Sequence, residues 1–273
     1  MKKKVMVISD MDGTLLRSDN TISKETEVYL RNLQDRGVEI TLASGRPYRA
    51  LIDYYNQIGL KGKLVCYNGG LIVDPQRNNK VIDANSYPLK LIQKIVNVVG
   101  ADNFVNFIIE NNDDIFIANK EDHSVDSFTH LDSKKIKAHY EKDVSKFKGD
   151  VYGGIFVLKR EREIQKFMEA GFSIPGIGVR FWDNCLIAEL YFTKINKYTA
   201  IEKVGKLVGI SPENFICFGD AANDMEMLYR SGIGVAMKNG NKVAKKYADV
   251  ISFTDNNHDG VINTLKLLIN AYN

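Results

Sequence analysis

Two aspartates, Asp10 and Asp12, follow the apolar run Val5–Ile8 and are separated by a single residue. Such a run predicts a buried strand, and ligands bind at the carboxyl ends of strands in open α/β sheets. Two carboxylates at that edge repel each other and lose hydration, so together they favour a bound cation. The pair therefore indicates metal-dependent chemistry.

Two other interpretations of the pair deserve a test. Aspartate and glycine are common turn residues, so Asp10, Asp12 and Gly13 could simply begin a turn. The same letters also begin a calcium-binding loop, but that loop needs a glutamate at its twelfth position, and counting from Asp10 reaches Thr21. A turn and a metal site remain open.

Three residues far away in the sequence are also predicted to lie at the carboxyl edge of the sheet. Ser44 follows the apolar stretch 40–43, Asp220 follows the stretch 215–219, and Lys197 is expected to open a helix. Because parallel strands end at one edge of a sheet, such residues converge there. Singly, Ser44 or Asp220 would be a helix cap and Lys197 a solvated lysine. Together they indicate a site for an anion and a cation.

The elements that would position these residues alternate between strand and helix. We expect strands at 38–43, 64–67, 215–218 and 234–237, a hairpin from 71–73 to 81–82, and helices at 23–36, 47–57, 197–207, from 223 and from 259. This alternation predicts an α/β fold with a Rossmann-like, doubly wound parallel sheet.

The middle third has a different, antiparallel pattern. We expect helices at 88–99 and 161–170 and strands at 104–110, 115–118, 151–158, 178–182 and 185–192, the last two joined by a turn at Asp183 and Asn184. Residues 120–150 give no assignment. The sequence thus predicts a core of residues 1–84 and 190–273, interrupted by an α+β domain at 85–189.

Composition limits the classes of partner. The 273 residues carry a formal net charge of only +3, and the one basic cluster, Lys2–Lys4, is terminal, so nucleic acid is not indicated. No run of 18 apolar residues exists and the amino end does not resemble a signal peptide, so we expect no membrane association. Three scattered cysteines, Cys66, Cys185 and Cys217, are expected to be buried free thiols, which favours a cytoplasmic location.

Four ordered motifs resemble those of the haloacid dehalogenase-like superfamily. They are DMDGTL at 10–15, ASGRP around Ser44, Lys197, and GDAAND at 219–224. The long insertion between the second and third motifs is similar to that of the Cof-type branch, which carries an inserted α/β cap of type IIB. The resemblance covers nearly the whole core.

The resemblance implies a role for each matching residue. Asp10 is expected to be the nucleophile that forms an aspartyl phosphate, Asp12 the general acid and base, and Lys197 the cation that stabilises charge on the phosphoryl oxygens. The implied cofactor is Mg²⁺, with Asp10, Asp12 and Asp220 as metal residues, Asp12 through its backbone carbonyl. Asp224 is either a further metal ligand or a residue that holds the ligands in place. The residues expected to bind phosphate or substrate are Ser44, Gly45, Arg46 and Asn223.

One position departs from the family pattern. The branch commonly has glycine after the lysine, whereas Tyr198 stands here, and Lys194 is close enough in sequence to compete with Lys197. Lys197 is favoured because it opens the predicted helix. Asn68 could also face the substrate, while Trp182, Asn184 and Glu189 are not assigned to a site.

These features predict a Mg²⁺-dependent phosphatase of small phosphorylated metabolites, with sugar phosphates as the leading class. The inserted domain would close over the site, exclude water and contact the leaving group. Transfer of the phosphoryl group to a sugar hydroxyl is a second hypothesis, and a phosphometabolite sensor without turnover is a third. A monomer or a homodimer is expected.

Overall fold

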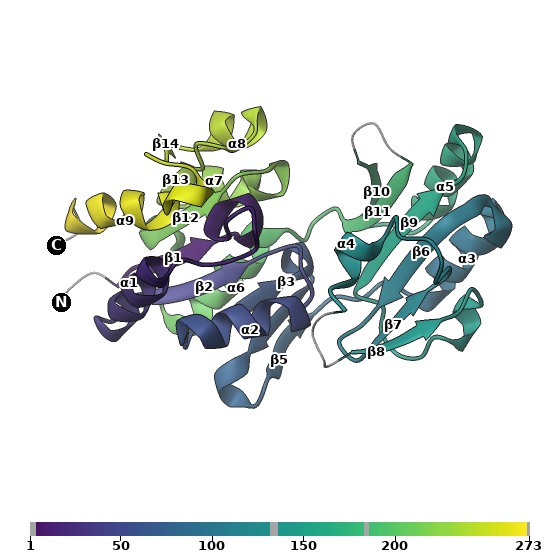
Figure 1. The fold of residues 1–273 in the computed structure, drawn as a ribbon, viewed down its shortest axis with the longest axis horizontal. Coiled ribbons are helices and arrows are strands. Elements are labelled where there is room, and N and C mark those ends of the chain that lie inside the picture. The colour runs from purple at the N-terminus through teal and green to yellow at the C-terminus, as the bar shows by residue number, and fades with distance from the viewer. Residues whose placement is uncertain (1–3, 132–135, 183–185, 272–273) are drawn as a thin grey trace. The chain divides into compact units, whose positions relative to one another are not determined.

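An eight-stranded sheet is formed by the two terminal thirds of the chain in the computed structural model, which describes residues 4–131, 136–182 and 186–271 (Figure 1). Its strand order is β14-β13-β12-β1-β2-β3-β4-β5. The strands are β1 (Met6–Ser9), β2 (Glu39–Ala43), β3 (Leu64–Cys66), β4 (Leu71–Asp74), β5 (Lys80–Ala84), β12 (Phe215–Gly219), β13 (Ile233–Ala236) and β14 (Val250–Ile251).

β1 occupies the point where the order of this sheet reverses. It pairs in parallel with β2 on one side and with β12 on the other. The next strands along the chain continue outward to β3 on the first side and to β13 on the second. Ligands of doubly wound sheets bind at the carboxyl edge of this switch point, and Asp10 follows β1 directly.

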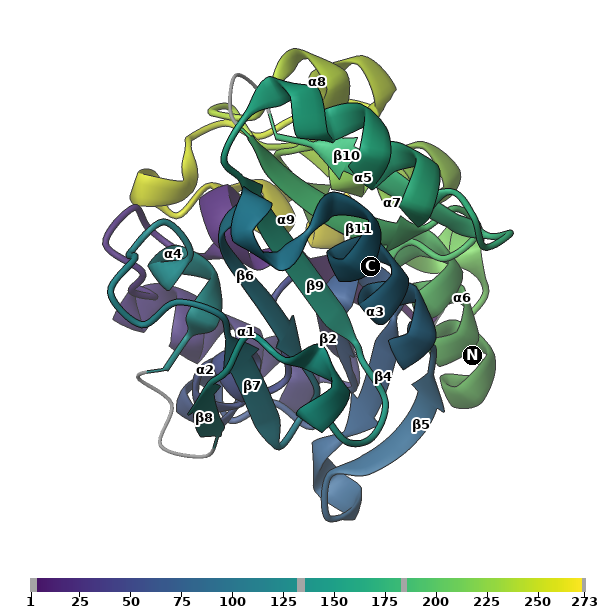
Figure 2. The ribbon, with the colours of Figure 1, turned by 90° about the vertical axis from the view of Figure 1, so that its right-hand side faces the viewer.

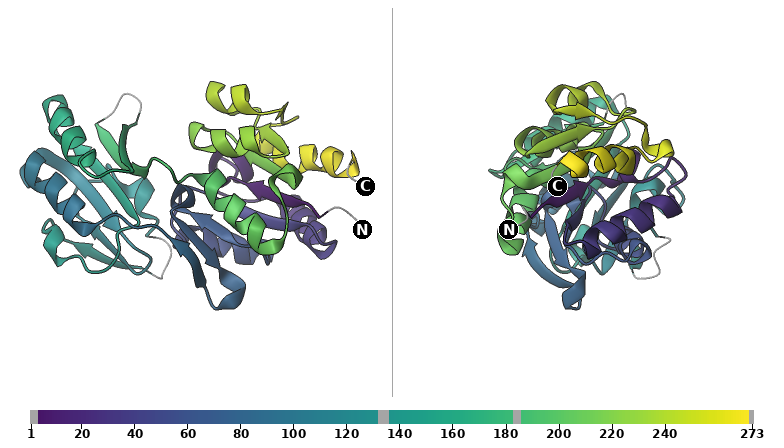
Figure 3. Two further views of the ribbon diagram at one scale, coloured as in Figure 1. Left: turned by 180° about the vertical axis from the view of Figure 1, so that it is seen from behind. Right: turned by 90° about the vertical axis from the view of Figure 1, so that its left-hand side faces the viewer.

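Helices cover both faces of the sheet. They are α1 (Lys24–Asp35), α2 (Arg49–Ile58), α6 (Lys197–Val208), α7 (Met225–Arg230), α8 (Lys242–Tyr247) and α9 (Gly260–Ala271). The first helix shows the local causes: the Ser23 side chain accepts a hydrogen bond from the Thr26 N–H, and Leu30 and Leu33 are buried one turn apart. Met6 and Ile8 of β1 pack with α6 to α8, whereas α1 and α2 lie on the opposite face (Figure 3).

The inserted segment forms a second compact unit with its own sheet, of order β10-β11-β9-β6-β7-β8 (Figure 2). Its elements are α3 (Leu89–Val99), β6 (Phe104–Glu110), β7 (Asp114–Ile117), α4 (Asp126–Thr129), β8 (Lys137–Tyr140), β9 (Gly153–Leu158), α5 (Ile164–Gly171), β10 (Ile177–Phe181) and β11 (Ile187–Phe192). Phe107 and Ile109 of β6 pack in the cluster with α3 and α5, and Ile108 packs in a separate cluster with Val125 and Phe128. One face of this sheet therefore carries two helices and the other carries α4.

The chain divides into Met1–Asp83 with Ile195–Asn273, which we call the core unit, and Ala84–Lys194, the cap unit. The expected second boundary at residue 190 falls inside β11, which pairs with β10 as far as Phe192. Because a paired strand stays with its sheet, the cap unit continues beyond that position.

Most expected elements of the core are confirmed, with three differences. The second helix begins at Arg49 and not at Pro47, because residues 44–48 form a turn in which the Ser44 hydroxyl accepts the Arg46 N–H at 3.1 Å. The sequence did not predict α8 or β14, whose apolar runs are too short to show a period. In the cap unit, the stretch 120–150 that gave no assignment contains α4 and β8.

Cys66 and Cys217 are buried free thiols, as predicted. The predictions for Lys2 and Lys3, for the turn at Asp183 and Asn184, and for Cys185 lie outside the described residues. Among the helices of the described ranges, none combines the length and the apolar character that a membrane span requires.

Candidate active site

Asp10 is held at the switch point by its own backbone. Its N–H donates to the carbonyl oxygen of Phe218 at 3.0 Å, which continues the pairing of β1 with β12. The residue is only 5% exposed. A carboxylate in such a place is largely stripped of water and needs polar partners within the protein.

Lys197 supplies the first of those partners. It is the first residue of α6, and the capping box of Asn196 with Thr199 fixes the start of that helix. The side chain is completely buried, and its Nζ lies 2.6 Å from Asp10 Oδ1 and 2.6 Å from Asp224 Oδ1. One ammonium group therefore bridges two carboxylates that come from different ends of the chain. Lys194, the alternative, is exposed.

Asp224 is anchored through both of its oxygens. Oδ1 accepts from Lys197, and Oδ2 accepts from the backbone N–H groups of Asp220 and Ala221, each at 3.0 Å. Its side chain is fully buried. These bonds fold the turn after β12 tightly, and they fix the backbone of Asp220 relative to Asp10 and Lys197.

Asp220 completes a group of three carboxylates. Its Oδ1 accepts from the Thr14 hydroxyl at 3.3 Å. Gly13, with φ +69°, lies against it, and a Cβ on Gly13 would stand 2.5 Å from Asp220 Oδ2. Oxygen atoms of Asp10, Asp220 and Asp224 all lie within 4.8 Å of one another. The described residues thus place three carboxylates around one point.

The electrostatics of this group favour additional positive charge. Burial raises the pKa of Asp10 well above its ordinary value, and Lys197 opposes that shift. Burial and the neighbouring Asp224 raise the pKa of Asp220 to about 6. Burial alone would lower the pKa of Lys197, but Asp10 and Asp224 outweigh it and raise that pKa. Three carboxylates and one ammonium leave an excess of negative charge.

An excess of carboxylate oxygens is the chemistry that suits a hard divalent cation. Mg²⁺ binds oxygen ligands and is held in proteins by one or two carboxylates together with water and phosphate oxygens. Asp10 and Asp220 are the better suited of the three, because both oxygens of Asp224 already have partners within the protein. The residues present fit the predicted metal.

The carboxylate of Asp12 lies outside this group. It pairs with Arg46, whose Nε donates to Asp12 Oδ2 at 2.7 Å and whose Nη2 donates to Oδ1. The Asp12 side chain is 55% exposed, against 12% for Arg46. Sequence reasoning placed both residues at the site but gave no reason to expect their pairing.

The loop after β2 and the loop after β3 meet beside the carboxylates. The Ser44 N–H donates to the Val65 carbonyl oxygen at 2.9 Å, and the Asn68 N–H donates to the Ser44 carbonyl oxygen at 2.9 Å. Asn223 Nδ2 donates to Asn68 Oδ1 at 2.9 Å. Asn68 therefore links the predicted phosphate residues Ser44 and Asn223. The helix α2 begins at Arg49, and the binding of phosphate by Ser44 and Gly45 stays a prediction.

The position of Asn68 depends on an unusual backbone. Tyr67 and Asn68 both have positive φ, at 50° and 53°. Gly69 has φ +103°, and a Cβ there would lie 2.4 Å from the Asn196 carbonyl oxygen. Residues other than glycine with a positive φ are strained, and such residues cluster at functional sites. The sequence Asn68-Gly69-Gly70 predicted a turn, but it did not predict that Asn68 would bond to Ser44 and Asn223.

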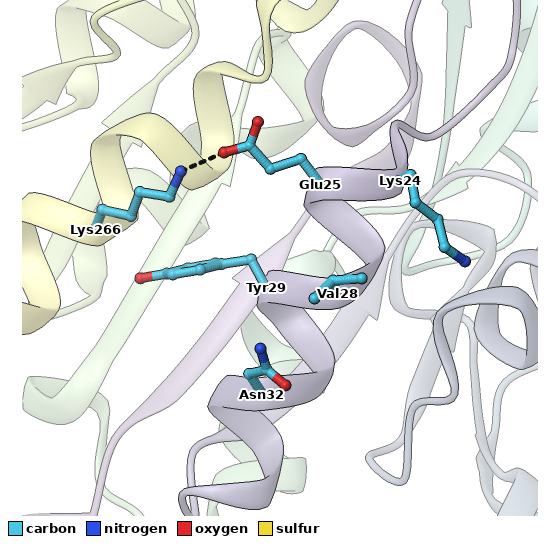
Figure 4. Close-up of a pocket in the computed structure, with 6 residues that line it drawn as sticks. All are labelled: Lys24, Glu25, Val28, Tyr29, Asn32 and Lys266. Carbon is cyan, nitrogen blue, oxygen red and sulfur yellow. Dashed lines mark hydrogen bonds and ion pairs between the residues drawn. The ribbon is translucent and has the colours of Figure 1, made fainter.

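Elsewhere in the described residues, no second group of three side chains that could hold a metal ion was found. In the cap unit, Glu189 pairs with Arg180 at 2.8 Å and Trp182 is 43% exposed. In the core unit, a shallow pocket between α1 and α9 is lined by Lys24, Glu25, Val28, Tyr29, Asn32 and Lys266 (Figure 4). Its one acid, Glu25, already pairs with Lys266 at 2.6 Å, so the pocket offers no group of carboxylates.

Residues 7–265 match the family described as haloacid dehalogenase-like hydrolase. The chain belongs to this family. The motifs that suggested it contribute Asp10, Lys197, Asp220 and Asp224 to the group of carboxylates with its lysine, and Ser44 to the loop beside that group.

Relatives of this hydrolase are named as phosphatases. The chain is 29% identical over 267 residues to the 5-amino-6-(5-phospho-D-ribitylamino)uracil phosphatase YitU of Bacillus subtilis, covering 97% of each chain. It is 26% identical over 266 residues to a second phosphatase of that name, YcsE, covering 96% of this chain and 94% of the relative. The predicted enzyme class, a phosphatase, is confirmed.

Solved structures share the fold along the whole length. A haloacid dehalogenase-like hydrolase from Bacteroides thetaiotaomicron superposes with a TM-score of 0.85 at 25% identity, covering 97% of this chain and 100% of the other. A sugar phosphatase of subclass IIB superposes at 0.78 with 21% identity, covering 97% and 99%. The α/β fold class is confirmed.

Proposed function

We propose that this hydrolase is a Mg²⁺-dependent phosphomonoesterase of small phosphorylated metabolites, acting through a phosphoryl group carried on Asp10. One observation carries the proposal: the buried ammonium of Lys197 lies between Asp10 and Asp224 at 2.6 Å from each, beside Asp220. Burying charged groups costs desolvation energy that their mutual attraction often does not repay, so stability alone does not explain this group. Attack on a phosphate ester is a use that needs both the carboxylate and the positive charge.

In the first step an Asp10 carboxylate oxygen attacks phosphorus, and the bond from phosphorus to the ester oxygen breaks. Lys197 orients Asp10 and stabilises negative charge on the phosphoryl oxygens. Bound Mg²⁺, held by Asp10 and Asp220, would supply further positive charge toward the same oxygens. Ser44, Gly45 and Asn223 are proposed to bind the phosphate.

Asp12 is proposed to handle the proton in both steps. As an acid it protonates the departing alcohol oxygen, and as a base it then takes a proton from the water that hydrolyses the aspartyl phosphate. A positioned acid and base contributes roughly 10²- to 10⁴-fold to such a rate. Of the predicted site residues, it is the exposed carboxylate, which suits contact with a leaving group.

The substrate class follows from the relatives by analogy. YitU and YcsE are both named 5-amino-6-(5-phospho-D-ribitylamino)uracil phosphatase, and the structural neighbour of subclass IIB is named a sugar phosphatase. We propose phosphate esters of sugars and sugar alcohols, with the cap unit supplying the contacts to the leaving group. The buried thiols of Cys66 and Cys217 support a reducing compartment, and we propose the cytoplasm.

The test is phosphate release from p-nitrophenyl phosphate and a panel of sugar and sugar alcohol phosphates, with Mg²⁺ or with EDTA. Asp10→Asn should lose essentially all turnover. Asp35→Asn is the matched control, because Asp35 is an exposed acid of the core unit that pairs only with Lys61 among the ion pairs found. Activity that persists in EDTA, or an active Asp10→Asn, would overturn the proposal.

The covalent step has its own test. Borohydride reduction of rapidly quenched enzyme should convert a phosphorylated Asp10 to homoserine, which peptide mass spectrometry detects at residue 10. Adding a sugar acceptor distinguishes hydrolysis from transfer: free phosphate supports a phosphatase, whereas a phosphorylated acceptor supports a transferase.

A further inference from the structure

The pair formed by Asp12 and Arg46 is the best-defined side-chain contact at the edge of the site. Two donors of the guanidinium face the two carboxylate oxygens, Nε to Oδ2 at 2.7 Å and Nη2 to Oδ1. Such a two-bond pair fixes the plane and the direction of a carboxylate, which one bond cannot do. Asp12 therefore has one defined orientation in the structure.

Arg46 is itself fixed by three further contacts within the core unit. Its Nη2 donates to Asn20 Oδ1 at 3.1 Å. Its guanidinium carbon lies 5.8 Å from the centre of the Tyr54 ring, and the Tyr54 hydroxyl donates to the Asn20 carbonyl at 2.9 Å. Its backbone N–H donates to the Ser44 hydroxyl at 3.1 Å. The guanidinium is thus a rigid support and not a mobile surface group.

The Asp12 side chain is much more exposed than that of its partner Arg46. The Arg46 side chain is 12% exposed and the Asp12 side chain 55% exposed. Three of the five N–H donors of Arg46, those on Nε and Nη2, already serve Asp12 and Asn20. The exposed member of the pair is the acid, which is the group that has to meet a leaving group.

We propose that Arg46 is a positioning residue, which holds Asp12 in the orientation that serves the leaving group. This inference rests on the proposed function. When the Asp10 oxygen bonds to phosphorus and the ester bond breaks, the electron pair of that bond stays on the leaving oxygen, and the Asp12 proton moves to it. Because proton transfer requires the Asp12 carboxyl group to be aligned with the leaving oxygen, free rotation of Asp12 would slow this step.

The inference predicts that the loss depends on the leaving group. An alkyl alcohol departs poorly unless it is protonated, whereas p-nitrophenolate departs readily without a proton. Arg46→Met should therefore lower kcat/KM about 10- to 100-fold on a sugar phosphate and less than about threefold on p-nitrophenyl phosphate. The ratio kcat/KM is compared because it covers the steps up to departure of the leaving group, whereas hydrolysis of the aspartyl phosphate, which also uses Asp12, is common to both substrates.

Three further variants make the test specific. Arg46→Lys keeps the charge but cannot form the two-bond pair, so it should recover only part of kcat/KM on the sugar phosphate. Arg17→Met removes a guanidinium of the core unit that pairs with Asp259 at 3.3 Å, and it should leave both substrates unaffected. In the double variant with Asp12→Asn, the Arg46→Met change should add nothing to the loss from Asp12→Asn alone.

The failures of the two proposals are distinguishable. A wild-type protein that hydrolyses neither substrate overturns the proposed function and this inference with it. An active wild type in which Arg46→Met lowers kcat/KM equally on both substrates, or raises it on the sugar phosphate, overturns the positioning role alone. If Arg46→Met does not fold, Arg46→Lys gives the same comparison between the two leaving groups.

Discussion

Replacing Lys197 with methionine removes the one positive charge found among the three carboxylates of the described residues. The side chain has no exposed surface, and its partners Asp10 and Asp224 have side chains that are 7% and 0% exposed. Methionine fills nearly the same space, so the change leaves little cavity. What it does leave is two buried carboxylates that each lose a 2.6 Å contact.

The magnitude follows from this burial. Removing one partner of a buried ion pair costs about 3 to 5 kcal/mol, because the remaining charge has neither water nor a counterion. We expect Lys197→Met to lower the free energy of unfolding by about 4 kcal/mol in EDTA. Lys203→Met is the matched control on the same helix: its ion pair with Asp83 is 48% and 33% exposed, so about 0 to 1 kcal/mol is expected.

The assay is urea unfolding followed by far-ultraviolet circular dichroism, in EDTA and again in excess Mg²⁺. Circular dichroism is preferred to fluorescence because the single tryptophan, Trp182, belongs to the cap unit. Mg²⁺ should restore part of the stability of Lys197→Met, since a cation at the same carboxylates replaces the missing charge. A loss in EDTA no larger than that of Lys203→Met would refute the reasoning.

Three further outcomes are expected. Gly13→Ala should lower the free energy of unfolding by about 1 to 2 kcal/mol, because Gly13 has a positive φ. It should also weaken activation by Mg²⁺, because the new Cβ would stand 2.5 Å from Asp220 Oδ2. An unchanged Mg²⁺ activation curve would contradict this. Asp224→Asn should lower kcat by about 10²-fold, because an amide cannot accept bonds on both sides and the turn shifts; steady-state rates at saturating Mg²⁺ measure it. Burial raises the pKa of the Cys66 thiol far above its usual range and that of Cys217 to about 12. Iodoacetamide should therefore label both cysteines roughly 10³-fold more slowly in the folded protein than in urea, since it reacts with the thiolate. Mass spectrometry of the labelled peptides measures the rates.

Much of the core could be predicted from local patterns. The Ser23 cap and the glycine at position 37 bound α1 within a residue or two of the prediction, and the apolar run after Phe215 gave β12. The short elements were missed: α8 has six residues and β14 has two, which is less than a pattern needs to show its period. The start of α2 was misplaced because proline after Arg46 suits both a helix start and a turn.

The amino-acid sequence by itself determined which residues meet at the sheet edge. The ends of parallel strands converge whatever the detailed packing, so Asp10, Ser44 and Asp220 were predictable as neighbours from their places after apolar runs, with Lys197 at the start of a helix. Only the tertiary structure decided which of them bond to each other. The pairings of Lys197 with Asp10 and Asp224, and of Arg46 with Asp12, join residues 27 to 187 positions apart. Such pairings depend on side-chain directions and on burial, and those exist only once the sheet and its helices have packed.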